Sequence, residues 1–140
     1  MRKLLIVFAL LSATITAKAQ EWVKAAESEE FTYYVNTTTR QRGDNYIVFE
    51  KYVPKNVYSE RSRLVELFQD SKWNRYSYDI KTLLVDIDLY RSKIINVVYY
   101  DVNGNVIKSY DTEDDKWSYA KPNTVHEAIC ETIEYIIKKK

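Results

Sequence analysis

Two hydrophobic periodicities follow one another along the chain. From Ile80 onward apolar residues alternate with polar ones up to Leu89, with Asp86 and Asp88 on the polar side, which is the pattern of a half-buried strand. Runs of branched and aromatic residues between turn-forming stretches predict five more strands. These strands cover 21–26, 31–35, 46–53, 94–100 and 106–110.

The second periodicity is helical. Apolar residues recur at spacings of three and four from Val125 through Ile129 and Ile133 to Ile136, which predicts a terminal helix with one apolar face. A shorter helix is predicted over 59–68, with Ser59 as its cap. The apolar face of this terminal helix needs a sheet against which it can pack.

These elements predict one α+β domain. The six strands form three consecutive hairpin-like pairs, and Asn103-Gly104 is the commonest pair for a two-residue hairpin turn. We therefore expect a six-stranded antiparallel sheet, a short inserted helix, and a C-terminal helix packed on one face of the sheet.

The first nineteen residues have the composition of a signal peptide. A charged start, Met1-Arg2-Lys3, precedes a short apolar run and an Ala17-Lys18-Ala19 cleavage pattern. The prediction is a signal peptide over 1–19 and a single exported domain over 20–140, in the periplasm, on the outer surface or secreted. No later stretch is long enough to span a membrane.

Charge and composition limit the classes of function that the sequence supports. Removal of the signal peptide leaves 18 of the 21 basic residues against 20 acidic ones, so the mature net charge of −2 argues against nucleic-acid binding. The thirteen tyrosines suit sheet surfaces, and such surfaces also suit protein recognition.

Few residues point to chemistry. His126 and Cys130 share a helix face, but a buried structural thiol is the favoured interpretation, and the two do not complete a zinc site. An enzymatic alternative requires both to share a cleft. The acidic cluster over 111–115 lacks the glycine and closing glutamate of a calcium loop, and solvation on the polar face of a strand accounts for Asp86 and Asp88. The sequence therefore predicts no catalytic, cofactor or metal site, and a protein that is not an enzyme.

Arg42-Gly43-Asp44 spells the tripeptide that animal integrins recognise at loop tips. It lies where a hairpin turn is expected, and turn formation alone accounts for Gly43 and Asp44. We favour the turn interpretation and keep integrin recognition as an alternative.

A series of short motifs occurs in order along nearly the whole mature chain. They are Glu21-Trp22-Val23, Tyr33-Tyr34-Val35-Asn36, Val85-Asp86-Ile87-Asp88-Leu89, 99–107 with Asn103 and Gly104, Trp117, and Pro122-Asn123-Thr124 through Cys130. In this order they resemble the surface-adhesin protein E family of Gram-negative bacteria. The resemblance implies a six-stranded antiparallel sheet with a helix on its concave side.

The resemblance also gives an interpretation of the single cysteine. Family members typically join a strand cysteine to a cysteine of the terminal helix, and here Leu89 stands at the strand position and Cys130 at the helix position. Cys130 would then be the surviving half of a lost disulfide, packed against Leu89 in the core. Asn123 replaces a common family glycine and tolerates the same left-handed geometry.

The function that the resemblance implies is a surface-exposed, non-enzymatic binding module for host matrix or plasma proteins such as vitronectin and laminin. Large amphipathic side chains make good anchors, so composition suggests binding residues. These are Tyr52, Lys55, Tyr58, Arg61 and Arg63. The alternative is a periplasmic protein of small-ligand or envelope-maintenance role, which a cavity lined by inward tyrosines would favour.

Overall fold

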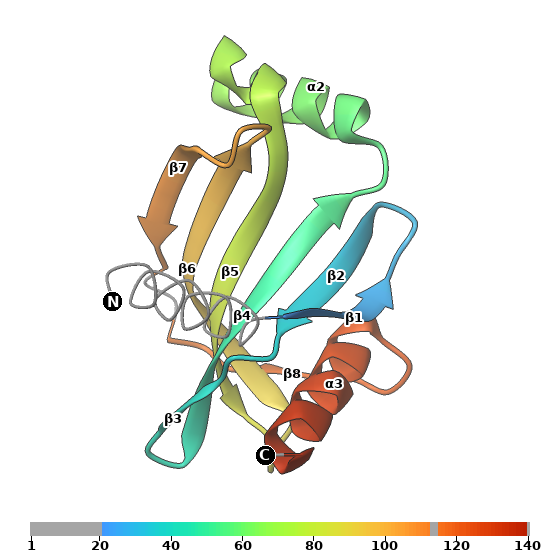
Figure 1. Cartoon of the computed structure of the whole chain (residues 1–140), viewed down its shortest axis with the longest axis vertical. Helices are drawn as coiled ribbons and strands as arrows, with labels where there is room; N and C mark the ends of the chain where they lie inside the picture. The colour runs from blue at the N-terminus through green and yellow to red at the C-terminus, as the bar shows by residue number, and fades with distance from the viewer. Residues whose placement is uncertain (1–20, 113–114, 140) are drawn as a thin grey trace, which may run out of the picture.

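The structure is a computed structural model that describes residues 21–112 and 115–139 of the 140-residue chain. The predicted signal peptide lies outside these residues. Within the described ranges, the strands form one twisted sheet, and two helices lie at opposite ends of it (Figure 1).

Six main strands run in the order β1-β2-β4-β5-β6-β7, and every neighbouring pair is antiparallel. The short strands β3 and β8 pair with β4 and β6. This arrangement confirms the predicted fold class. The bounds are β1 Trp22–Glu27, β2 Phe31–Asn36, β3 Arg40–Arg42, β4 Asn45–Pro54, α2 Val57–Phe68, the 3-10 helix η1 Ser71–Arg75, β5 Tyr76–Asp86, β6 Arg91–Asp101, β7 Val106–Asp111, β8 Ser118–Tyr119 and α3 Val125–Lys139.

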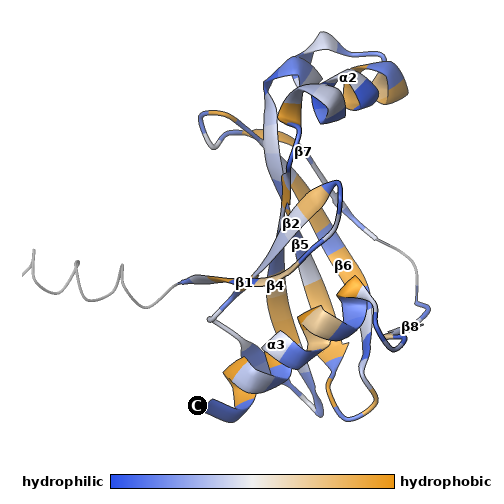
Figure 2. Ribbon diagram, turned by 90° about the vertical axis from the view of Figure 1, so that its right-hand side faces the viewer, coloured by the Kyte–Doolittle hydropathy of each residue, from blue (hydrophilic) through white to orange (hydrophobic). Residues whose placement is uncertain are grey.

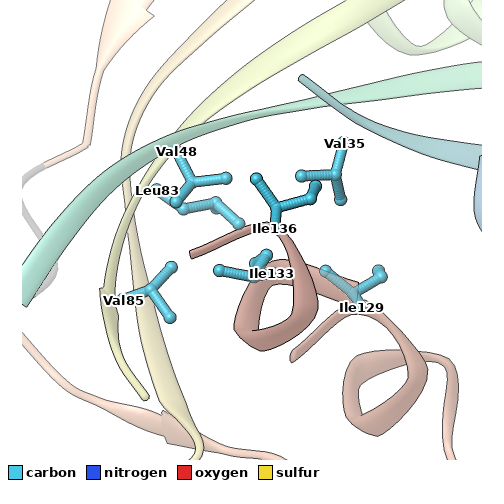
Figure 3. Packing of buried hydrophobic residues seen from close by; sticks show 7 residues of the cluster. All are labelled: Val35, Val48, Leu83, Val85, Ile129, Ile133 and Ile136. Atoms are coloured by element: carbon cyan, nitrogen blue, oxygen red, sulfur yellow. The ribbon is translucent and has the colours of Figure 1, made fainter. Parts of the chain in front are cut away.

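The main core lies between α3 and the concave face of the sheet (Figure 3). The helix contributes Ile129, Ile133 and Ile136, which confirms the helical stripe read from the sequence. The strands contribute inward side chains at alternate positions, as period-two strands must. These are Val35, Val48, Leu83 and Val85.

Helix α2 lies at the other end of the sheet (Figure 2), where a second, smaller core is formed by residues of α2, η1 and β5. Leu64, Trp73 and Tyr76 are fully buried there. The Trp73 ring stacks on Phe68 with 4.6 Å between centroids and meets Tyr99 edge-on at 5.0 Å. The inserted helix was predicted, but its aromatic anchor on η1 was not.

The Leu89 prediction is wrong. β5 ends at Asp86, and the chain then turns, because the Asp86 carboxylate accepts a hydrogen bond from the Leu89 backbone N–H and lies 2.8 Å from the Arg91 guanidinium. Leu89 is 55% exposed on this turn, whereas Cys130 is 1% exposed in the core. Leu89 therefore does not lie in the core beside Cys130, which is a free buried thiol.

Two local predictions also need correction. The loop that contains Asn103-Gly104 has four residues, since the Asp101 carboxylate accepts from the backbone N–H groups of Asn103 and Asn105 and only Gly104 takes a positive φ, of 79°. Helix α2 begins earlier than predicted, and its cap is Asn56, whose side-chain oxygen accepts from the Ser59 backbone N–H at 3.1 Å.

The left-handed geometry expected at Asn123 is confirmed, with φ of 61°. Asparagine is one of the few residues other than glycine that visit this region at little energetic penalty. Asn123 lies two residues before Val125, the first residue of α3, so this left-handed turn leads into the helix.

Candidate functional site

A pocket of about 470 Å³ opens on the concave face, between the sheet, the first turns of α3 and the side chains of Thr112, Lys116 and Ser118. Its walls come from six parts of the chain that are far apart in sequence. They are Tyr33, Glu50, Tyr52, Leu83, Ser92, Lys93, Ile94, Thr112, Lys116, Ser118, Val125, His126 and Ile129.

The pocket adjoins a polar belt that crosses the sheet between its two apolar cores. Strand pairing places Tyr33 opposite Tyr52 and Tyr52 opposite Asp79, and it places Glu50 opposite Lys81. Directly opposite residues of antiparallel strands share a face, so all five side chains belong to the concave face. None of the five is a member of either buried apolar cluster, although Tyr33 packs against the edge of the main one.

Glu50 is the most unusual residue of the pocket because its carboxyl group is buried. The residue is 3% exposed, and its carboxylate accepts a hydrogen bond from the Tyr52 hydroxyl. Burial raises the pKa of Glu50 from 4.5 to about 7, while the Tyr52 hydroxyl and nearby Lys81 act against this rise. Glu50 therefore changes charge near neutral pH.

Asp79 and Lys81 form an ion pair beside Glu50. The Lys81 Nζ lies 4.0 Å from the Asp79 carboxylate and 3.4 Å from the centroid of the Tyr52 ring. The Tyr76 hydroxyl donates to Asp79 at 2.5 Å. Burial raises the pKa of Asp79 and lowers the pKa of Lys81. Two carboxyl groups thus share one ammonium in this belt.

The walls around these groups are aromatic and apolar. The rings of Tyr33 and Tyr52 meet edge-on with 4.7 Å between centroids, and Phe31 meets Tyr52 at 5.9 Å. Leu83, Ile94, Val125 and Ile129 complete the apolar surface. A mostly apolar pocket with a few placed polar groups is the usual composition of a small-ligand site.

The remaining polar groups lie towards the α3 side and the solvent. His126 Nε2 and Ser92 Oγ are 2.9 Å apart, and burial lowers the pKa of His126. Lys93 is half-buried, with its Nζ 4.6 Å from the centroid of the Trp117 ring, and Lys116 is exposed. Basic groups therefore line the outer part of the pocket and an acidic group lines its buried part.

The predicted binding residues do not form one site. Tyr52 lies in the pocket, whereas four others lie on or beside α2, at the far end of the sheet: Lys55, Tyr58, Arg61 and Arg63. Of these, Arg61 donates from Nε to the Tyr76 carbonyl at 2.7 Å, and Arg63 pairs with Glu60. Tyr58 remains 76% exposed.

The two residues considered for covalent chemistry are not arranged as an activated pair. Burial raises the pKa of Cys130 to about 11, which is opposite to the lowered pKa of a nucleophilic thiolate. The His126 ring has Ser92 as its hydrogen-bond partner. Across residues 21–112 and 115–139, no three His, Cys, Asp or Glu side chains are grouped so that they could hold a metal ion.

The Arg42-Gly43-Asp44 tripeptide lies at an exposed hairpin tip between β3 and β4. Arg42 pairs with Asn45, so the loop has two residues, and Gly43 takes the positive φ of 63° that the first loop position of such a turn requires. A second hollow of about 470 Å³ lies beside this tip, lined in part by Asp44 and Asp88.

Of the residues that carry the resemblance, the two tryptophans lie beside basic groups on the sheet. Lys51 Nζ is 5.4 Å from the Trp22 ring centroid, and the Arg91 guanidinium is 4.3 Å from that of Trp117.

Comparison of the chain with known protein families, curated proteins and solved structures finds no match, so the family resemblance stays a prediction. No helix of the described residues is long and apolar enough to cross a membrane.

Sequence reasoning did not single out Glu50, Asp79 or Lys81. The available signal was their position within the strands. Glu50 lies two residues after the inward Val48, and Asp79 and Lys81 are in phase with Leu83. Charged residues in the inward phase of a strand indicate either a paired buried network or a site, and this distinction needs the tertiary structure.

Proposed function

We propose that the chain is an exported, non-enzymatic binding protein that holds a small ligand in the pocket between the concave face and α3. One observation carries the proposal: a carboxyl group that is almost completely buried, Glu50, lines an open pocket together with the inward-facing Tyr33 and Tyr52. Such a cavity favours a small ligand over a flat protein-binding patch.

Size and energetics support this proposal. Ligand pockets usually measure about 300 to 1,000 Å³, and the volume of about 470 Å³ lies within that range. A buried carboxyl group such as Glu50 destabilises a fold unless it is fully paired, and an apolar side chain of similar size often stabilises more. Placing Glu50 at a solvent-accessible hollow is therefore better explained by binding than by stability.

The test is a thermal-shift screen of small molecules against the mature protein, with one variant that fills the pocket. Ile94 lines the pocket and is partly exposed, so Ile94→Trp should occupy it without disturbing either core. Val102→Trp is the matched control, because Val102 is exposed on the β6–β7 loop at the far end of the sheet.

We expect compounds that raise the melting temperature of the wild type and of Val102→Trp but not that of Ile94→Trp. The proposal is wrong if no compound of a chemically diverse library stabilises the wild type. It is also wrong if every stabilising compound acts equally on Ile94→Trp, because such ligands would bind elsewhere.

The second candidate is an adhesin-like module that binds host proteins, as the family resemblance implies. The observation that favours it is the exposed Arg42-Gly43-Asp44 tip, since integrins read this tripeptide at loop tips. Protease digestion of the tagged protein on intact cells tests surface exposure. Adhesion of animal cells to the purified protein should then fall in Asp44→Glu and persist in Asp88→Glu, whereas protection of the protein on intact cells would contradict this candidate.

A further inference from the structure

The pocket has opposite charges at its two ends and apolar walls between them. We propose that it takes a small zwitterion with an apolar body, with its ammonium against Glu50 and its carboxylate near Lys93 and Lys116. Apolar amino acids and short apolar peptides share this chemistry. The inference rests on the proposed function and assigns the class of ligand.

The buried end lacks one positive charge. Glu50 and Asp79 are both buried carboxyl groups, and Lys81 is the ammonium that the structure places among them. The Lys81 ammonium pairs with Asp79 and lies over the Tyr52 ring, so among the described residues the Tyr52 hydroxyl is the hydrogen-bond donor to ionised Glu50. A buried anion gains most from a cation that enters the same low-dielectric space.

The outer end has the opposite charge. Lys93 and Lys116 line it, and they lie nearer the solvent than Glu50 does. A simple amine would be attracted to Glu50 but repelled by these two ammonium groups. A simple anion would be attracted to the two lysines but repelled by ionised Glu50. A zwitterion satisfies both ends, which is the electrostatic complementarity that fixes ligand orientation.

The middle of the pocket suits an apolar body. Leu83, Ile94, Val125 and Ile129 lie between the charged ends, with the rings of Tyr33 and Tyr52 at one side. Aromatic faces also attract an ammonium within about 6 Å, so the tyrosines support the cation of the ligand as well as its apolar part.

Binding of such a ligand should depend on pH through Glu50. Two lysines lie at the mouth of the pocket, and the groups that surround this carboxyl group come from β2, β4, β5, β6 and α3. They are Tyr33, Tyr52, Asp79, Lys81, Ser92, His126 and Cys130, with Lys93 and Lys116 at the mouth. Since the pKa of Glu50 in the free protein is about 7, its ionised fraction falls about tenfold between pH 8 and pH 6.

The experiment is isothermal titration calorimetry of the mature protein at pH 8 and pH 6. The probes are L-phenylalanine and L-leucyl-L-phenylalanine as zwitterions, phenylalanine amide without the carboxylate, and N-acetylphenylalanine without the ammonium. We expect at least one zwitterion to bind at pH 8 and about tenfold more weakly at pH 6. Both altered probes should bind at least about tenfold more weakly than phenylalanine or the dipeptide.

Glu50→Gln provides the residue-level test, with Glu131→Gln, an exposed glutamate of α3, as the matched control. Glutamine keeps the shape of the side chain and removes the charge, so zwitterion affinity should fall at least about tenfold and lose its pH dependence, while the control should bind as the wild type does. Circular dichroism confirms that both variants are folded.

Two outcomes would overturn the zwitterion assignment. One is tight binding of N-acetylphenylalanine, and the other is zwitterion binding that is unchanged in Glu50→Gln. In either case the screen with Ile94→Trp still decides whether the pocket holds a ligand at all. A compound that needs the open pocket but no ammonium would refute this inference and leave the proposed function in place.

Discussion

Replacing Glu50 with glutamine should change how the stability of the protein depends on pH. Burial raises the pKa of Glu50 from 4.5 to about 7, so between these values the folded protein holds a proton that the unfolded chain has released. The contribution of Glu50 to the free energy of unfolding is fully present below its unfolded pKa of 4.5. It is lost as the pH rises through its folded pKa of about 7. Glutamine carries no proton to lose, so the variant should lack this decline.

The magnitude follows from the shift. Each unit of difference between the folded and unfolded pKa corresponds to about 1.4 kcal/mol of unfolding free energy. For a pKa raised from 4.5 to about 7, the free energy of unfolding that is lost between pH 5 and pH 8 is about 2.5 kcal/mol. The stability of Glu50→Gln relative to the wild type should therefore increase by about this amount over the same range. Asp79, whose pKa burial also raises, is present in both proteins and acts in the same direction in each.

Urea unfolding followed by tryptophan fluorescence measures this difference, because Trp73 is fully buried and reports loss of the core. Glu131→Gln, which alters an exposed carboxylate, should give a stability profile parallel to the wild type. Parallel profiles for Glu50→Gln and the wild type would show that Glu50 stays ionised in the folded protein, and they would refute the reasoning about its burial.

Three further substitutions test the fold. Ile133→Ala should lower the free energy of unfolding by about 2 to 5 kcal/mol in urea titrations, because Ile133 is fully buried between α3 and the sheet. Asn56→Ala should lower it by about 1 kcal/mol through loss of the cap of α2, and Asn74→Ala on the exposed side of η1 should change it far less. Leu89→Cys should leave two free thiols after mild oxidation, as counted in denaturant, because Leu89 is exposed and Cys130 is buried; formation of an intramolecular disulfide would contradict the position of Leu89.

The elements that sequence predicted correctly are those in which periodicity and burial agree. Ile129, Ile133 and Ile136 recur at helical spacing and all lie in the core, because no other face of α3 could cover the sheet. Leu83 and Val85 alternate with half-buried residues in β5. In these segments local pattern and tertiary packing require the same conformation.

The alternation of apolar and polar residues gave a wrong prediction for Leu89, because it continues past the end of β5. Ile87 and Leu89 extend the alternation that begins in β5, but the chain reverses there, held by the Asp86 carboxylate and by Tyr90 in a left-handed conformation with φ of 46°. A tyrosine at positive φ is uncommon, so neither composition nor spacing predicts it. The turn conformation depends on the pairing of Asp86 with Arg91, which only the folded sheet brings together.

The candidate site could not be predicted from the sequence because the burial of Glu50 depends on tertiary contacts. The sequence shows Glu50 as one charged residue within an aromatic strand, and pattern alone cannot tell whether it faces solvent or the core. Its burial depends on α3, which lies about 80 positions further along the chain, and on the register that sets it opposite Lys81. All five predicted binding residues were chosen by composition, which carries no information on position, and only Tyr52 belongs to the pocket.

The position of Lys81 determines how the charge of Glu50 is balanced. A lysine directly across from a glutamate would ordinarily neutralise it, and strand register does place these two residues opposite each other. However, the Lys81 ammonium lies over the Tyr52 ring and within 4.0 Å of Asp79, and Tyr76 holds Asp79 in place through its hydroxyl. The Lys81 ammonium therefore forms its ion pair with Asp79 and acts on Glu50 only through its electrostatic field, so a proton balances the charge of Glu50 in the free protein and, as we propose, the ammonium of a ligand balances it in the complex.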